Sequence, residues 1–498
     1  MPSPSPISPS RVLTALRIFC LAVVGLHLAA PLFDEASAWG LWPYTYLPHA
    51  GQLLLAALAV LTILPNTAAA ILRVVQRAHH ASRITFHRRH ALFLLLSLLS
   101  LIPFTLLRVV HTRWGDAYIL VNAIAYPDPA LRLTTTWQAP LDVWLHAQLW
   151  ALGNAWFGWA DAWPAYWILS PLAGALYVYV LLRLADSVGC NRTEKLLIVG
   201  LLGTLGAMQL FFGYAENYSL AAAGVLVFLW LALETLAGRR PLWQPSLALA
   251  VTIGLHPSTV VLSPALLYVA WVWGRSRQGD KETSKSGTIP EGQGGWWAAV
   301  WQVAWPMVLV AGGVVLLMAL NGNGLAALTS TDRPGGGDGR LFVPLFETTT
   351  RWEHYTLFSW AHLLDWLNMQ MLTAPVTLGG LAIVGVALLA ERLRVNSQAG
   401  TAKHAEASSD RQALTFLALA TGLYWLFTWV WNPDYGGQRD WDLFSLAAIP
   451  STLLLARLLP RVLSDRSQLA QAALMLTTVS AMHTIAWIYQ NTLPWEWP

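Results

Sequence analysis

The stretch that decides the fold is ALFLLLSLLSLIPFTLLRVV, residues 91–110, in which the first charged side chain is Arg108. A helix needs about 20 apolar residues to cross the hydrocarbon core of a bilayer, and this run has that length. Similar apolar runs occupy 12–32, 50–72, 164–184, 195–213, 218–237, 243–256, 258–274, 297–320, 372–391, 412–431, 443–460 and 468–489. We therefore predict an all-α, polytopic transmembrane bundle of about 11–13 spans.

Composition supports a membrane protein. Of the 498 residues, 56% are hydrophobic and 11% are charged, whereas soluble domains carry about 25% charged residues. The 28 Trp residues suit a chain that places indole rings in the headgroup layers. The net charge of +4 is too small for a nucleic-acid-binding surface, so no nucleic acid partner is expected. We divide the chain into a Pro/Ser-rich, disordered segment, 1–10, and one transmembrane domain, 11–498.

The distribution of basic residues predicts the orientation. Segment 73–90 has five arginines and no acid, which is typical of a cytoplasmic loop. Alternating from it puts the N-terminus and the other basic loops in the cytoplasm as well. We expect a multi-pass protein of a bacterial plasma membrane.

Two long loops, 111–163 and 321–371, then fall on the non-cytoplasmic side. Each contains a segment predicted to be an amphipathic helix lying in the membrane interface, 141–157 and 351–371. In the first, leucines recur at helical spacing. They are Leu141, Leu145, Leu149 and Leu152.

Asp116 is the first candidate for catalysis. It follows a span directly, with Gly115 before it and Tyr118, a candidate substrate-binding residue, close behind. An acid at the membrane boundary is partly withdrawn from water, which raises its pKa and suits it to general-base work. The alternative is a solvated acid that marks a helix end.

A short turn holds a second set of candidates, Tyr214, Glu216, Asn217 and Tyr218. A carboxylate among aromatic rings is typical of a sugar or cation site, and ordinary interface aromatics with one solvated Glu fit the pattern equally well. His256 lies at an apparent break between two apolar runs, before a proline. It could bind a phosphate or act as an acid, although a histidine that caps a kink is more common.

Arg439, Asp440 and Asp442 lie together just before a span. The two acids are candidates to bind sugar hydroxyls or, with Asp116, a divalent cation as cofactor, and the guanidinium could bind a phosphate bidentately. The D-x-D spacing is also common in ordinary loops. Arg340, at the end of a Gly-rich stretch (331–340) that we interpret as a lid, is a further candidate phosphate ligand or a solvated charge.

The order of landmarks over residues 91–190 resembles that of GT-C class, polyprenyl-phosphate-dependent membrane glycosyltransferases. An outer loop opens with Asp116, an interfacial helix begins at Pro140-Leu141 and ends at Phe157-Gly158, and a span rich in small residues (170–176) follows. The resemblance implies a polyprenyl-phosphate sugar donor, a glycan, lipid or protein acceptor, and Asp116 as catalytic base or metal-associated acid. Many relatives have a second acid where this chain has Ala117, and a second proline where it has Ala139.

Two other classes remain open. A transporter or flippase of a lipid-linked or polar substrate would place polar groups near the membrane midplane, often in repeated halves. This chain keeps its charges at one edge and shows no repeat, which disfavours that class, although the break at His256-Pro257 keeps it open. A non-catalytic scaffold of the cell envelope would not require acids in several separate outer loops.

Overall fold

The computed structural model of the chain describes residues 8–78, 86–283, 294–329, 339–395 and 406–495. The first helix begins at Pro9, so the segment predicted to be disordered, 1–10, is helical at its last two residues. Residues 1–7 of that segment lie outside the described part. Most of the Gly-rich stretch interpreted as a lid, up to residue 338, lies outside it too.

The described residues form nineteen α-helices and no strand, which confirms the all-α prediction. The helices are α1 (Pro9–Ala29), α2 (Glu35–Ala38), α3 (His49–Ile63), α4 (Pro65–Ala78), α5 (Phe86–Leu106), α6 (Ala117–Ile124), α7 (Pro140–Phe157), α8 (Trp163–Val188), α9 (Arg192–Gly203), α10 (Ser219–Leu236), α11 (Trp243–Leu255), α12 (Ser263–Thr283), α13 (Gly294–Leu320), α14 (Trp360–Thr373), α15 (Thr377–Val395), α16 (Glu406–Val430), α17 (Trp441–Ser445), α18 (Ala448–Val462) and α19 (Arg466–Asn491).

The chain is a polytopic membrane protein. Among the described residues nine helices are long and apolar enough to span a bilayer, and eleven if each of two bent pairs counts as one span. Only 11% of the apolar window in α5 is buried inside the protein, against 78% of the window in Trp441–Val462. The outward face of α5 consists of leucines such as Leu94, Leu95 and Leu98. Contiguous apolar surface of this kind belongs against lipid.

Several of the predicted spans are not single straight helices of spanning length. The run 50–72 bends by 87° between α3 and α4, where Pro65 cannot continue the hydrogen-bond ladder of α3. The run 195–213 holds only α9 and a 3₁₀ turn, Gly206–Phe211. Gly206 meets the end of α14 so closely that a Cβ there would lie 1.7 Å from the Leu372 carbonyl oxygen. The run 243–256 forms α11, whose 13 residues are fewer than a straight span requires.

One predicted interfacial helix has the expected bounds and the other does not. Helix α7 covers Pro140–Phe157. Helix α14, in contrast, begins only at Trp360, where the Ser359 hydroxyl caps the helix by accepting a hydrogen bond from the backbone N–H of His362. The preceding segment is irregular because the Glu353 carboxylate binds the backbone N–H groups of Thr349 and Thr350. Such local bonds compete with helix formation. Helix α14 then bends by 98° into α15.

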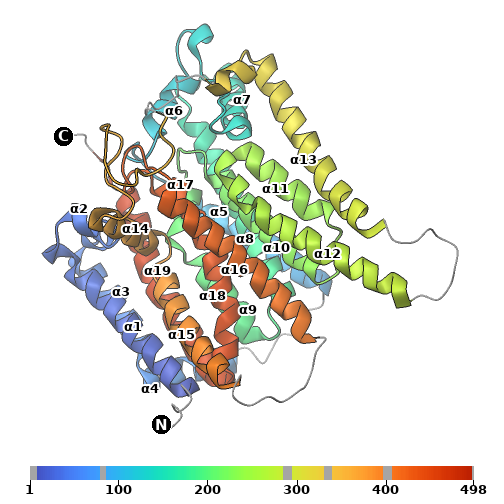
Figure 1. Cartoon of the computed structure of the whole chain (residues 1–498). Helices are drawn as coiled ribbons and strands as arrows, with labels where there is room; N and C mark the ends of the chain where they lie inside the picture. The colour runs from blue at the N-terminus through green and yellow to red at the C-terminus, as the bar shows by residue number, and fades with distance from the viewer. Residues whose placement is uncertain (1–7, 79–85, 284–293, 330–338, 396–405, 496–498) are drawn as a thin grey trace.

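The two ends of the bundle differ in the helices and the charged groups that they carry. Helix α10 lies at the centre, packed against α8 and α11, and α6, α7, α14 and α17 gather at one end, opposite α4 (Figure 1). Ion pairs such as Lys195–Asp186 and Arg457–Asp410 lie around α9 and α18, away from those four helices. The loops between α5 and α6, between the Gly206–Phe211 turn and α10, and before α17 form the opposite end, and they hold the candidate site.

Candidate functional site

Carboxyl groups from three distant segments meet at this end. Asp116 immediately precedes α6, Glu216 lies in the turn before α10, and Asp442 lies in the first turn of α17. The backbone N–H of Asp116 donates to Glu216 Oε1, and the N–H of Gly115 donates to the carbonyl oxygen of Arg439 at 3.0 Å. The three segments therefore form one site, which we call the acidic cluster: Asp116, Glu216, Asp440 and Asp442.

Gly115 allows this close approach. Its φ is +46°, and a Cβ at this position would lie 2.4 Å from Glu216 Oε1 and 3.2 Å from Asp442 Oδ2. Glycine adopts positive φ without steric cost and leaves this space open. Both carboxylates therefore face the backbone that carries Asp116.

Two tyrosines donate hydrogen bonds to different acids of the cluster. The Tyr214 hydroxyl donates to Asp442 Oδ2 at 3.0 Å, and the Tyr435 hydroxyl donates to Asp116 Oδ1 at 3.2 Å. The backbone N–H of Tyr435 also donates to Asp440 Oδ2 at 2.8 Å. Hydrogen bonds to buried carboxylates hold them in one orientation, so the acids have defined positions.

A tight turn sets the position of Tyr435 relative to Asp440. Gly436 has φ +84°, and its N–H donates to the Pro433 carbonyl oxygen at 3.1 Å. The Gly436 carbonyl oxygen in turn accepts from the N–H of Asp440 at 3.0 Å. The sequence Asn-Pro-Asp-Tyr-Gly-Gly supplies the residues that such a turn requires.

Burial dominates the electrostatics. Glu216 is 3% exposed and Asp442 is 2% exposed, while Asp116 is half-buried. In the part of the chain that the structure describes, no Lys or Arg lies at ion-pair distance from any acid of the cluster. Burial of several carboxylates without an ion-pair partner is costly, and it favours their neutral forms.

The protonation states differ within the cluster. Burial raises the pKa of Asp116 to about 6; the charge of Asp434 adds to this, and the Tyr435 hydroxyl and Arg439 oppose it. Burial also raises the pKa of Glu216 and of Asp440 well above the usual range, and neighbouring acids add to both shifts. With a pKa of about 6, Asp116 is mostly ionised near neutral pH, whereas burial favours the neutral forms of Glu216 and Asp440. Different pKa values for neighbouring acids are typical of acid–base sites.

The remaining candidates are divided between the cluster and its surroundings. Tyr218 is close to the cluster, and its ring centroid lies 4.5 Å from that of His256. His256 caps the break before Pro257–Leu262, because its Nδ1 accepts from the N–H of Ser258. Asn217 is buried, and its Oδ1 has no hydrogen-bond partner among the residues that the structure describes. Tyr118 is 62% exposed and stays outside the buried cluster.

The two candidate phosphate ligands differ in position. The Arg439 guanidinium lies over the Tyr435 ring, 5.0 Å from its centroid, and is therefore at the cluster. Arg340 pairs with Glu353 at 3.0 Å, next to the backbone bonds that join Leu341 to Asn432. It lies on the neighbouring loop and has a partner already.

A metal site is not evident among the described residues. No group of three or more His, Cys, Asp or Glu side chains there is arranged to hold a metal ion, although Asp116, Asp440 and Asp442 were candidate ligands. Asp440 Oδ2 is occupied by the Tyr435 N–H.

Sequence reasoning missed a second buried set beside the cluster. Asp142 and His146 of α7 are both buried, with the carboxylate 2.9 Å from the imidazole Nδ1. The His146 ring stacks on Tyr166 at 4.0 Å, and Tyr166 lies within electrostatic reach of Asp142, Glu216 and Asp116. The acid and histidine four residues apart on an interfacial helix were the signal in the sequence, because such residues share a helix face.

Comparisons of the chain with protein-family models, with curated proteins and with solved structures found no match. The fold and the site define a polytopic helical membrane protein in which buried carboxyl groups meet at one end of the bundle.

Proposed function

We propose that this protein is a membrane glycosyltransferase that moves a sugar from a polyprenyl-phosphate donor to an acceptor hydroxyl. The observation that supports this most directly is the convergence of Asp116, Glu216 and Asp442, from segments that are far apart in sequence, onto one end of an apolar bundle. A lipid-linked donor reaches such a site from the bilayer. The GT-C resemblance assigns Asp116 the central role, and Asp116 is the acid of the cluster with an accessible, ionised carboxylate.

The chemistry would run as follows. The Asp116 carboxylate takes the proton of the acceptor hydroxyl. At the same time the hydroxyl oxygen of the acceptor attacks the anomeric carbon of the donor sugar. The bond between that carbon and the phosphate oxygen breaks, and the polyprenyl phosphate leaves with the electron pair. Arg439, stacked on Tyr435, is placed to stabilise the phosphate charge. Glu216, whose neutral form is favoured by burial, would donate a hydrogen bond to a sugar oxygen.

The location follows from the basic loops and not from the geometry of the bundle. The basic residues of segment 73–90 favour a cytoplasmic position for the end of the bundle that carries α4, away from the acidic cluster. The acidic cluster would then face the non-cytoplasmic side of a bacterial plasma membrane. No nucleotide-sugar site is required on that side, because the donor is lipid-linked.

The test uses the full-length protein in liposomes that contain polyprenyl phosphate esters of single hexoses or pentoses. Release of polyprenyl phosphate and appearance of a glycosylated acceptor are measured by chromatography. Asp116→Asn should reduce transfer about 10²–10⁴-fold. The matched control is Asp128→Asn in the same loop, which is exposed and caps a short 3₁₀ turn, and it should retain wild-type transfer. Transfer by Asp116→Asn within twofold of wild type would exclude Asp116 as the base.

A transporter is the second candidate, and the broken helices favour it. The breaks after α9 and after α11 border the turn of Glu216 and the cap at His256, and discontinuous helices are typical of transporter sites. Uptake of a labelled lipid-linked or free sugar into proteoliposomes, without release of polyprenyl phosphate, would favour transport over transfer.

A further inference from the structure

Two histidines that are not part of the acidic cluster meet inside the bundle. His27 of α1 and His483 of α19 are both 0% exposed, and His27 Nε2 lies 2.9 Å from His483 Nδ1. The second nitrogen of each ring faces a backbone carbonyl oxygen. His27 Nδ1 lies 2.7 Å from the oxygen of Val23, and His483 Nε2 lies 2.9 Å from that of Leu372. The four ring nitrogens therefore make three contacts in a row.

Each of these contacts requires one hydrogen between its two atoms. A carbonyl oxygen only accepts, so both outer nitrogens must donate. Two neutral imidazoles carry one N–H each, and with both used at the carbonyls the two inner nitrogens face each other with lone pairs. Moving either hydrogen to the centre leaves a lone pair against a carbonyl oxygen instead. Three hydrogens satisfy the row, which is one more than a neutral pair carries.

The position of Leu372 favours an extra proton on the pair, whereas burial opposes it. Leu372 lies in the last turn of α14, where carbonyl oxygens have no partner within the helix. This is the negative end of the helix dipole, and a cation is stabilised there. A buried positive charge is costly without a counter-ion. Because the two effects oppose each other, we expect the extra proton to bind reversibly.

Few other ionisable groups share this level of the bundle. The Tyr44 ring is edge-on to His27, with centroids 5.4 Å apart, and its hydroxyl donates to the carbonyl oxygen of Gln52. Among the described residues, no carboxylate lies at ion-pair distance from either histidine of the pair. Cys20 on α1 and Asp365 on α14 lie about two helical turns along their helices from the row. The charged residues of α9 and α15 lie in the first turn of α9 and the last turns of α15, away from the row.

The helix that the pair binds is also bonded to the candidate site. Asp365 of α14 accepts from the N–H of Gly437 at 3.2 Å through Oδ2 and from the indole of Trp39 at 2.8 Å through Oδ1. Gly437 follows the turn that carries Tyr435, the donor to Asp116. Helix α14 therefore runs from this turn to the histidine pair, and a movement of its end would reach the candidate site.

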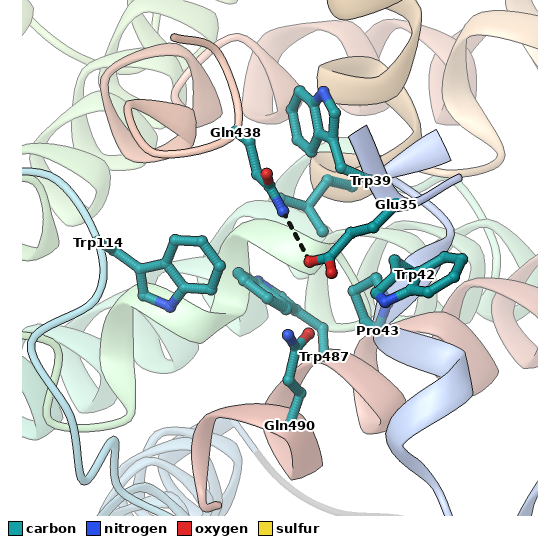
Figure 2. A pocket seen from close by; sticks show the side chains of 9 residues that line it. Glu35, Trp39, Trp42, Pro43, Trp114, Gln438, Trp487 and Gln490 are labelled. Atoms are coloured by element: carbon teal, nitrogen blue, oxygen red, sulfur yellow. Dashed lines mark hydrogen bonds between the residues drawn. The ribbon is translucent and has the colours of Figure 1, made fainter. Parts of the chain in front are cut away.

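A small cavity adjoins the pair (Figure 2). Leu372 lines it, and so does Trp487, one helical turn after His483. Its interior has room for about one water molecule. Glu35 and Gln490 line the same cavity, and the Glu35 side chain is 32% exposed. The cavity is the route by which we expect a proton to pass between the pair and the surface.

We propose that His27 and His483 form a binding site for one proton, which is held in an N–H···N bond between the rings and fastens the end of α14 to α1 and α19. When this proton leaves, one of the three contacts is lost. One ring then gives up its carbonyl oxygen, or the two rings separate. Proton binding by the pair does not depend on which reaction the acidic cluster performs.

The test is magic-angle-spinning NMR of the full-length protein in lipid bilayers, with ¹⁵N-labelled histidine, from about pH 5 to about pH 8. Ring nitrogens with and without a hydrogen have well-separated ¹⁵N shifts. At the lowest pH, neither ring of the pair should have a hydrogen-free nitrogen, and His27 Nε2 and His483 Nδ1 should show scalar coupling across their bond. Raising the pH should remove the coupling and produce a hydrogen-free nitrogen.

Two variants complete the test. In His27→Gln a carboxamide N–H replaces the ring as donor to His483 Nδ1 without an extra proton. The coupling should then be lost, and His483 should keep one hydrogen-free nitrogen at every pH. His49→Gln, at an exposed position, is the control and should leave the signals of the pair unchanged.

Two results would overturn the proposal. One is a hydrogen-free nitrogen on either ring of the wild-type pair at the lowest pH. The other is the absence of coupling between the rings at every pH. Both are read from the wild-type protein, so they decide the question even if His27→Gln does not fold.

Discussion

The acidity of Asp116 is expected to respond in opposite directions to two conservative substitutions in one turn. Tyr435→Phe removes the hydroxyl that donates to Asp116 Oδ1 at 3.2 Å and leaves the ring and backbone N–H in place. Asp434→Asn removes a negative charge that raises the pKa of Asp116. Because the base must be ionised, the acidic limb of the pH–rate profile reports its pKa.

The structure sets the size of the first effect. A hydrogen bond of this kind contributes about 0.5–1.5 kcal/mol net, and one pKa unit corresponds to about 1.36 kcal/mol. Tyr435→Phe should therefore move the limb upward from about 6 by roughly 0.4–1 unit. Asp434→Asn should move it downward, because like charge no longer opposes ionisation.

The assay is kcat/KM for transfer from a short-chain polyprenyl phosphate sugar, measured from pH 4.5 to pH 8.5 (about the range in which the protein is expected to stay folded). The contribution of Asp116 to the free energy of unfolding should fall as the pH rises, whereas the transfer rate should increase. The Asp116 pKa is 3.8 for the free side chain and about 6 in the protein, so its contribution to stability is present below 3.8 and is lost as the pH rises through 6. Identical limbs in wild type and both variants, or shifts in the same direction, would refute Asp116 as the titrating base.

Two further substitutions test the packing of the cluster. The Gly115→Ala variant should unfold at a lower temperature and lose transfer, because the added Cβ would collide with Glu216 Oε1. The control is Gly158→Ala, also at positive φ, where an added Cβ would meet no non-neighbouring atom of the described residues within 4 Å. It should lower the free energy of unfolding only by the left-handed strain of about 1–2 kcal/mol. Tyr214→Phe leaves Asp442 Oδ2 without its donor, which should destabilise the protein by about 1–3 kcal/mol in thermal unfolding monitored by intrinsic fluorescence. An unchanged melting temperature for Tyr214→Phe would contradict the bond, and equal losses for the two glycine variants would contradict the clash.

The positions of the helices were largely predictable. An apolar run such as 91–106, which lies within α5, must be helical in a bilayer, because no water is present to satisfy its backbone groups. Where the observed helix ends differ from the predicted ones, a proline or a local hydrogen bond accounts for the difference. Pro65 ends α3, and the bonds from Glu353 to the preceding backbone delay α14 until Trp360.

The candidate site was only partly predictable. Asp116, Glu216 and Asp442 were recognised singly from their setting at loop boundaries. Asp142 was missed because its helix was interpreted by its leucines, yet its carboxylate is fully buried. Tyr118 was included because it is near Asp116 in sequence, but its position on the exposed face of α6 separates it from the cluster.

The sequence by itself determined that the chain is an all-helical membrane protein and which of its loops carry acids, since both follow from local composition and length. Only the tertiary structure decided that Asp116, Glu216 and Asp442 meet and that Arg340 pairs with Glu353 instead. Helix formation depends on residues a few positions apart, whereas the meeting of loops depends on how helices hundreds of residues apart pack. That packing leaves little trace in any single segment.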